Sequence, residues 1–387
     1  MSEQSKITQE LLNSLEVSPV WLLEEHLLKK NLEKLKFVKD QTGVKILLAL
    51  KGFALFHTFD LIREYLDGCC ASGLNEAILS SKRFQKQTHT YSPAFKAEEI
   101  EKIAQLSNHI VFNSPSQLKL YAKKAREINP DISIGIRVNP EFSSASAEIY
   151  NPCGLYSRLG TLRENFSEEL LKIVDGFHFH ALCEQNSDAF EEVLKVFEEK
   201  FGEFLPKLSW VNFGGGHLIT KEDYDTQKLI RVLNSFKEKY PNLEIFLEPG
   251  EAIGWQTGVL IATVLDIVHN KMDIAILDTS AEAHMPDTVI MPYKAKVRGA
   301  KEPFEEKYTY KLTGNTCLAG DVMGDYSFAS PLKRGDKIIF EDQMHYTMVK
   351  ATTFNGINLP SIAILKEDGA LSIVREFGYE DFESRLG

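Results

Sequence analysis

The stretch VKILLALKGFALF, from Val44 to Phe56, joins a short apolar run to a charged residue. The residues from Val44 to Leu50 are almost all apolar, which is typical of a strand buried on both faces. Lys51 follows at once. An ammonium group at the end of a buried strand is costly to desolvate unless it is paired or chemically changed. The stretch therefore predicts an internal strand with a candidate functional lysine at its end.

The same strand-then-helix pattern repeats along the chain, and helical patterns such as 188–202 and 226–240 separate most of the strands. Eight such units over roughly 225 residues favour a (β/α)₈ barrel, which we place at residues 25–255. A doubly wound sheet is the alternative, but such a sheet would be expected to have fewer strands. The expected strands are 45–50, 68–72, 88–92, 109–114, 132–139, 176–181, 210–216 and 244–250.

After about residue 255 the pattern becomes rich in strands, with few helices between them. We expect an all-β second domain, a sandwich or barrel-like sheet, over residues 256–387, and residues 1–24 could pack onto it. The runs that indicate strands are 257–270, 272–280, 289–297, 307–314 and 336–342.

Composition limits the class of protein. The 387 residues carry a formal net charge of −11 and are 43% hydrophobic, which suits a globular chain of two domains and disfavours nucleic-acid binding. The five cysteines are odd in number and form no CxxC pair, so we expect a cytoplasmic protein without disulfides or a metal site. We find neither an apolar run of about 18 residues nor a signal-peptide pattern, and expect no membrane span.

Candidate site residues lie at the predicted strand ends, where barrel enzymes carry their active sites. Lys51 ends the first strand, His178 and His180 lie at the sixth, the glycines Gly214, Gly215 and Gly216 at the seventh, and Glu248 at the eighth. A run of glycines can point several N–H groups at a phosphate, although such runs are also ordinary turns.

The other strand-end residues allow two interpretations each. Glu248 could be a salt-bridged carboxylate or the partner of a cofactor's ring nitrogen. His180 could be a satisfied core histidine or could stack on a flat ring, and Arg137 could serve the site or pair with a carboxylate. A Schiff-base lysine, a phosphate loop and a carboxylate for a pyridine nitrogen together suit pyridoxal phosphate. A Schiff-base aldolase would use the lysine alone.

At these residues the chain resembles the fold type III pyridoxal-phosphate decarboxylases, the alanine racemase-like group, over nearly its whole length. LALKGF resembles the motif of the cofactor lysine, which implies that role for Lys51. HFHALCE resembles the motif of the ring-stacking histidine, His180. GGGH resembles the phosphate loop, and EPGE implies a ring-nitrogen partner in Glu248 and a phosphate contact near Gly250.

Two later motifs extend the resemblance. GNTCLAGD (314–321) is similar to a segment in which the cysteine acts near the substrate Cα and the aspartate contacts substrate, both from the partner subunit. It implies these roles for Cys317 and Asp321, and a homodimer; a small buried hydrophobe is the alternative for Cys317. HYTMVKATTFNG (345–356) implies that Tyr346 binds the cofactor phosphate.

Departures from the family pattern indicate the substrate. Glu251 stands where ornithine and diaminopimelate decarboxylases have arginine, and Leu318 stands where they have an acid. The EPGEA and GNTCLAGD forms resemble carboxynorspermidine decarboxylases of polyamine biosynthesis, whose substrates carry several amines. Glu251 and Asp287 could pair with those amines, although Asp287 could equally be an exposed loop carboxylate. A diaminopimelate or ornithine decarboxylase, a racemase and a non-catalytic polyamine regulator remain the alternatives.

Overall fold

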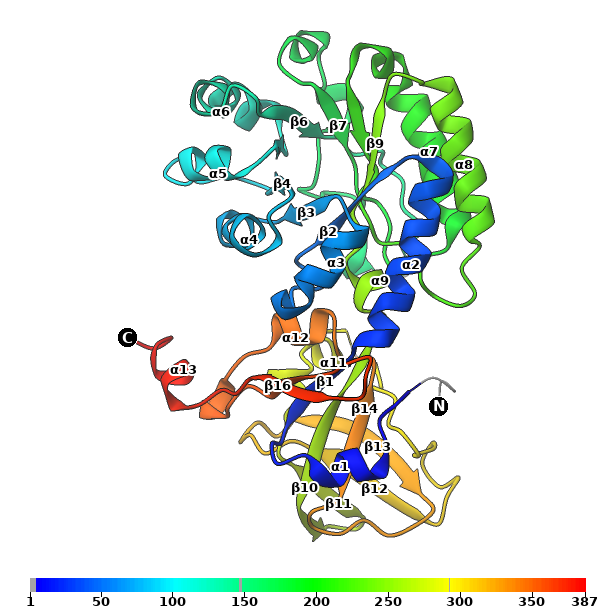
Figure 1. The fold of residues 1–387 in the computed structure, drawn as a ribbon, viewed down its shortest axis with the longest axis vertical. Helices are drawn as coiled ribbons and strands as arrows, with labels where there is room; N and C mark the ends of the chain where they lie inside the picture. The colour runs from blue at the N-terminus through cyan, green and yellow to red at the C-terminus, as the bar shows by residue number, and fades with distance from the viewer. Residues whose placement is uncertain (1–4, 146–147, 292) are drawn as a thin grey trace. The chain divides into compact units, whose positions relative to one another are not determined.

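The computed structural model describes residues 5–145, 148–291 and 293–387. It contains two compact units, each with its own sheet (Figure 1). One unit is Asn31–Ile253. The other combines Met1–Lys30 with Gly254–Gly387.

The first unit is a closed barrel of eight parallel strands, as the sequence predicts. Each strand pairs with the next, and the last returns to the first, with Lys45 opposite Phe246 and Ile46 opposite Leu247. The strands are β2 (Lys45–Ala49), β3 (Gly68–Ala71), β4 (Gln87–Tyr91), β5 (His109–Phe112), β6 (Ser133–Arg137), β7 (Gly176–His178), β8 (Trp210–Asn212) and β9 (Glu244–Leu247).

Helices surround this barrel on the outside (Figure 1). Their starts follow local capping rules: the Ser114 side chain accepts from the Gln117 N–H with Pro115 at the first helical position, and Asp225 caps the helix at Thr226. Between β6 and β7 the described residues form only short 3₁₀ turns. The α-helices are α2 (Glu25–Thr42), α3 (Phe59–Tyr65), α4 (Leu74–Leu79), α5 (Ile100–Leu106), α6 (Pro115–Ile128), α7 (Ser187–Phe201), α8 (Thr226–Lys239) and α9 (Glu251–Gly254).

Aromatic side chains fill the middle of the barrel. A Cβ atom at Gly176 would lie 2.1 Å from the Trp210 ring, so the glycine leaves room for the indole. The rings of His89 and His109 are buried and stack with centroids 3.8 Å apart. Phe246 packs edge-on against both histidines. This layer forms a packed floor below the strand ends.

The second unit is a sheet with the strand order β13-β12-β11-β10-β1-β15-β16, in which β14 also pairs with β10. Strand β1 lies between β10 and β15, so a segment from the start of the chain is central to this sheet. The strands are β1 (Val20–Glu24), β10 (Gly258–His269), β11 (Asp273–Leu277), β12 (Tyr308–Thr313), β13 (Val322–Phe328), β14 (Lys337–Glu341), β15 (Ser361–Leu365) and β16 (Leu371–Arg375).

One predicted strand in this unit is wrong. Within 289–297, the described residues include the end of helix α11 (Asp287–Ile290) and a single bridge from Val297 to Phe340. The helix starts after Pro286, whose φ of −61° is already helical. The other short helices of the unit are α1 (Gln9–Ser14), α10 (Ala281–His284), α12 (Tyr346–Lys350) and α13 (Tyr379–Glu383). No helix in the described part of the chain is long and apolar enough to cross a membrane.

Candidate active site

The barrel brings together the candidate residues that follow its strands. In a closed parallel barrel all carboxyl ends share one rim. Lys51 follows β2, Arg137 ends β6, and His180, the three glycines and Glu248 follow β7, β8 and β9. Arg137 and Glu248 both act electrostatically on Lys51.

Lys51 combines solvent access with a deep position. The Lys51 side chain is exposed to solvent. The surrounding protein nevertheless desolvates the ammonium group, which lowers the pKa of Lys51. The Arg137 guanidinium also lowers this pKa, whereas Cys70 and Glu248 oppose the effect. A lowered pKa increases the fraction of neutral amine, which is the nucleophilic form.

Glu248 is held as a carboxylate. Burial raises its pKa, but the adjacent His178 and the Asn212 amide outweigh burial, so its pKa is lowered. Asn212 Nδ2 donates to Glu248 Oε1 at 2.6 Å, and His178 Nε2 lies 3.3 Å from Oε2. An ionised, nearly buried carboxylate with fixed orientation can hold a proton on a neighbouring basic nitrogen.

His180 is fixed as a neutral imidazole. Burial places its pKa well below 6.5, and its Nδ1 accepts a hydrogen bond from the Gly215 N–H at 2.9 Å. The carbonyl oxygen of His180 accepts from Arg137 Nη2 at 3.0 Å. The ring therefore has a set orientation, as a stacking surface requires.

The glycine loop is explained largely by close packing. A Cβ atom at Gly214 would lie 2.7 Å from His180 Nδ1, one at Gly215 would lie 2.2 Å from the Glu248 carbonyl oxygen, and one at Gly216 would lie 1.9 Å from the Leu182 carbonyl oxygen. The Gly214 N–H donates to Asn212 Oδ1 and the Gly215 N–H donates to His180. Within the described residues no hydrogen bond starts from the Gly216 N–H. An anion at this loop thus meets one available N–H of the three.

Among the residues that the structure describes, no carboxylate forms an ion pair with Arg137, although the sequence allowed such a partner. It is 5% exposed, its guanidinium lies 4.8 Å from the Tyr91 ring centroid, and its hydrogen bond goes to the His180 backbone. The Tyr91 hydroxyl donates to Asn113 Oδ1 at 2.7 Å. The arginine supports the strand end that carries His180.

Sequence reasoning missed Asn212 and Cys70. Cys70 is buried on β3 beside β2, and both Lys51 and Glu248 act on its thiol, whose pKa burial raises. The adjacent Cys69 interacts instead with Ser80. Alternation along β3 and β8 could have separated inward from outward side chains.

The remaining candidates lie on the second unit. Cys317 is exposed, and its N–H donates to Asn355 Oδ1 at 2.6 Å. Tyr346 begins α12. Asp287 pairs with Lys350 at 2.5 Å and its side chain is 18% exposed, so it is not the exposed loop carboxylate that the sequence allowed.

Asp321, for which the resemblance implies a substrate contact, is buried and bonded within its own unit. It is 3% exposed. Its Oδ1 accepts from the Ala281 N–H at 2.7 Å, and its Oδ2 accepts from the Thr316 hydroxyl at 2.6 Å. Both oxygens of this carboxylate already bind groups of its own unit.

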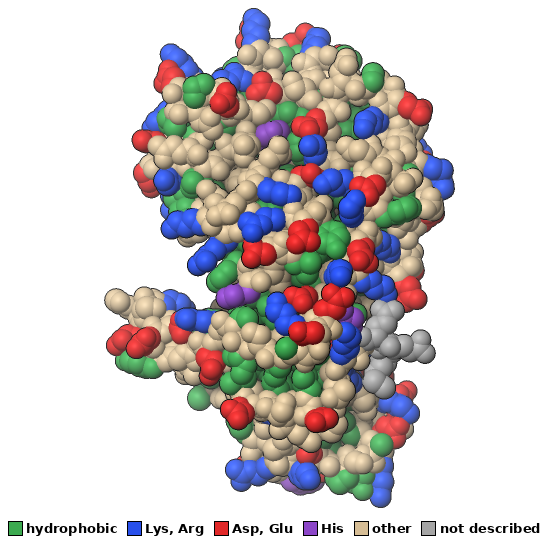
Figure 2. Space-filling view, in the orientation of Figure 1, with side chains coloured by type: hydrophobic (Ala, Val, Ile, Leu, Met, Phe, Trp, Pro, Cys, Tyr) green, Lys and Arg blue, Asp and Glu red, His purple; other side chains and the backbone are tan. Residues whose placement is uncertain are grey.

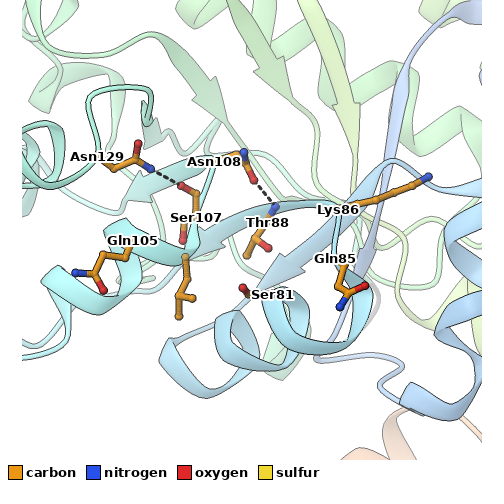
Figure 3. Close-up of a pocket in the computed structure, with 9 residues that line it drawn as sticks. Ser81, Gln85, Lys86, Thr88, Gln105, Ser107, Asn108 and Asn129 are labelled. Carbon is orange, nitrogen blue, oxygen red and sulfur yellow. Dashed lines mark hydrogen bonds between the residues drawn. The ribbon is translucent and has the colours of Figure 1, made fainter.

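A separate hollow of about 300 Å³ lies at the opposite, amino-terminal ends of β4 and β5 (Figure 3). Its polar groups mostly bind one another: Asn108 accepts from the Thr88 N–H, and Asn129 donates to the Ser107 carbonyl. Lys86 donates to the carbonyl oxygens of Arg63 and Leu66. These engaged groups do not form a second candidate site.

Comparison with known proteins identifies the family. A family model described as "Pyridoxal-dependent decarboxylase, C-terminal sheet domain" matches residues 37–343. The chain belongs to this pyridoxal-dependent decarboxylase family. The family's cofactor accounts for an accessible lysine and a fixed carboxylate at one barrel rim.

Relatives within the family narrow the comparison. The chain is 52% identical to a carboxynorspermidine/carboxyspermidine decarboxylase of Campylobacter jejuni, over 95% of this chain and 98% of that protein. It is 44% identical to a carboxyaminopropylagmatine decarboxylase of Synechocystis, over 96% of this chain and 95% of the relative. A crystal structure of the Campylobacter jejuni carboxynorspermidine decarboxylase with norspermidine has a TM-score of 0.89, 51% identity, and covers 95% of this chain and 99% of its own.

Proposed function

We propose that this pyridoxal-phosphate-dependent carboxy-lyase decarboxylates carboxynorspermidine and carboxyspermidine to norspermidine and spermidine in polyamine biosynthesis. The observation that carries the proposal is the 52% identity, over nearly the full length of both chains, to an enzyme named for both substrates. The likeness to a structure that holds norspermidine supports the same substrate class.

The rim residues fit the cofactor. Lys51 offers an amine for the aldehyde, Glu248 offers an ionised carboxylate for the ring nitrogen, and His180 offers a fixed ring to stack on. When bound, the pyridoxal ring supplies an electron sink for the bond that breaks. The Gly216 N–H, the backbone near Gly250 and Tyr346 are the proposed phosphate contacts, with Arg137 supporting His180.

The chain's own residues handle protons. Desolvation by the surrounding protein lowers the pKa of Lys51 and so favours its neutral amine, the form that can accept a proton. Glu248 remains ionised and keeps a ring nitrogen protonated. The Cys317 thiol is the proposed proton donor to the substrate Cα after CO₂ leaves.

We assign recognition of the substrate amines to two acids, Glu251 and Asp287. Glu251 begins α9 directly after the EPG segment and acts electrostatically on Cys183, on which Lys51 also acts. Asp287 already binds one ammonium group, that of Lys350, and could bind a substrate amine in its place. We assign Asp321 to folding, because its oxygens are engaged.

A homodimer with shared active sites follows from the proposed role of Cys317. Cys317 is exposed, and Leu318 beside it is 40% exposed. A thiol that donates a proton in an active site must be shielded from water, and a partner subunit can provide the surface that shields it. We place the enzyme in the cytoplasm, because the odd number of cysteines suits a reducing compartment.

On the face shown in Figure 2, acidic and basic side chains are interspersed.

The deciding experiment is CO₂ release by the purified protein with added pyridoxal phosphate. We would compare carboxynorspermidine, carboxyspermidine, carboxyaminopropylagmatine, meso-diaminopimelate and L-ornithine. Turnover of the first two alone is expected. Carboxyaminopropylagmatine is the substrate in the name of the 44% identical relative. If the protein prefers it, the proposed substrate is wrong but the proposed reaction is right. Turnover of diaminopimelate or ornithine would overturn the substrate, and no turnover would overturn the activity.

A further inference from the structure

Asn212 binds two parts of the site with one amide group. The residue is fully buried at the end of β8. Its Nδ2 donates to Glu248 Oε1 at 2.6 Å, and its Oδ1 accepts from the Gly214 N–H at 2.9 Å. No family motif considered above assigns a role to this residue.

We propose that Asn212 is a positioning residue that sets Glu248 against the cofactor's ring nitrogen and fixes the glycine loop in the same register. This inference rests on the proposed function, since it concerns the Glu248 carboxylate in its role toward the ring nitrogen. Asn212 itself has no contact with substrate in this scheme.

The hydrogen bonds determine how the amide is oriented. A main-chain N–H can only donate, so the group facing Gly214 must be the amide oxygen, and the NH₂ must face Glu248. The Glu248 N–H also donates to the Gly214 carbonyl oxygen at 2.7 Å. The loop and the carboxylate are therefore tied through both backbone and side chain.

The second contact of Glu248 is weaker. His178 Nε2 lies 3.3 Å from Oε2, but the contact lacks hydrogen-bond geometry. Asn212 thus gives the carboxylate a short hydrogen bond of 2.6 Å, beside the longer contact of His178 and the interaction with the Cys70 thiol. Loss of a hydrogen bond to a charged group lowers the affinity that depends on it by about 10- to 100-fold.

Two near-isosteric variants separate positioning from mere packing. N212L removes both contacts. N212D keeps the acceptor for Gly214 but donates to Glu248 only while the two carboxyl groups share a proton. Asn139→Asp is the matched control, because Asn139 is also buried and its amide binds only the backbone of Glu141 and Leu159.

The readout is equilibrium binding of two ligands to the apo-protein: pyridoxal phosphate and its analogue with CH in place of the ring nitrogen. N212L should weaken the binding of pyridoxal phosphate by about 10- to 100-fold more than the binding of the analogue, because both ligands carry the phosphate that meets the glycine loop and only pyridoxal phosphate has the ring nitrogen. N212D should bind pyridoxal phosphate progressively more weakly than wild type as pH rises, with no such trend for the analogue.

The inference would be overturned if the Asn212 variants bound both ligands more weakly by the same factor, or bound pyridoxal phosphate as tightly as wild type does. If N212L does not fold, the pH trend of N212D decides alone. Asn139→Asp should change the affinities for the two ligands by the same factor. Wild-type CO₂ release is measured first: its absence rejects the proposed function, whereas an active wild type with indifferent Asn212 variants rejects only this inference.

Discussion

His180 and Gly215 are joined by a hydrogen bond in which the glycine N–H donates to the histidine Nδ1 at 2.9 Å. Nδ1 must therefore be unprotonated, and the neutral ring carries its proton on Nε2. The glycine loop thus selects both the tautomer and the orientation of the ring that we propose stacks on the cofactor.

Replacing His180 with alanine should weaken pyridoxal phosphate binding by about tenfold, since a stacking contact contributes up to about 1.5 kcal/mol. An absorbance titration of the apo-protein measures this. His269→Ala is the control, because that side chain is 71% exposed on the other unit. Equal affinities for the two variants would contradict the assigned stacking role.

Stability of the apo-protein should fall as pH decreases from about 6.5 to 4. Burial lowers the pKa of His109 and of His217 from 6.5 to about 4, so the unfolded chain binds more protons in this window and stability is lost on acidification. Each histidine contributes about 3 kcal/mol to the loss.

The midpoint of urea unfolding, followed between pH 4 and 8, checks this prediction. His217→Gln should flatten the acid limb of the profile, because one depressed pKa is removed. A profile of the same steepness in the variant would show that the buried imidazole of His217 does not titrate as inferred.

Gly216→Ala should destabilise the barrel by more than Gly43→Ala. Both glycines have positive φ, +87° and +69°, which costs a non-glycine residue about 1–2 kcal/mol. At Gly216 the new Cβ would also lie 1.9 Å from the Leu182 carbonyl oxygen, whereas at Gly43 it meets only the flexible Lys237 Nζ. Denaturant unfolding compares the two, and equal losses would show that backbone conformation alone requires the glycine at 216.

Lys51→Ala should abolish the visible absorbance of the cofactor-loaded protein and lower CO₂ release by at least about 10³-fold, because the covalent attachment is lost. Lys45→Ala is the matched control, because Lys45 begins the strand that Lys51 follows, and its Nζ is 3.6 Å from Glu244. CO₂ release retained by Lys51→Ala would exclude the proposed role.

Cys317→Ala should lower turnover by about 10²-fold or more, as expected when a general acid is removed, without changing cofactor affinity. Mixing it with Lys51→Ala tests whether sites are shared. Random exchange of subunits between the two variants should restore about a quarter of the sites if Cys317 of the partner subunit completes each one. No recovery despite demonstrated exchange would place both residues in the same subunit's site.

The barrel could be predicted because its strands are short apolar runs at regular intervals, each followed by an amphipathic helix. The strands β15 and β16 were missed, although residues 366–369 form a turn between them. The other partner of β15, strand β1, is distant in sequence, and half-buried strands give a weaker apolar signal. The helix at Asp287–Ile290 replaced an expected strand because Pro286 favours a helix start.

The candidate site was predictable where a residue type stands out at a strand end, as Lys51 and Glu248 do. Asn212 and Cys70 were missed because their significance depends on which side of a strand faces inward and on which neighbour lies across it. For Asp321, the sequence does not show that the carboxylate oxygens bind the backbone at Ala281 and the hydroxyl of Thr316.

The place of β1 in its sheet has a consequence for synthesis of the protein. Val20 pairs with Ile261 on one side and with Ser361 on the other. The ribosome makes β1 before the whole barrel and β15 after it, so this sheet cannot be completed until both the barrel and β15 have been synthesised. The barrel lies wholly between these segments and can fold earlier. Until β15 has been made, the apolar strand Val20–Glu24 lacks one of its two neighbours, and its open edge needs protection from aggregation.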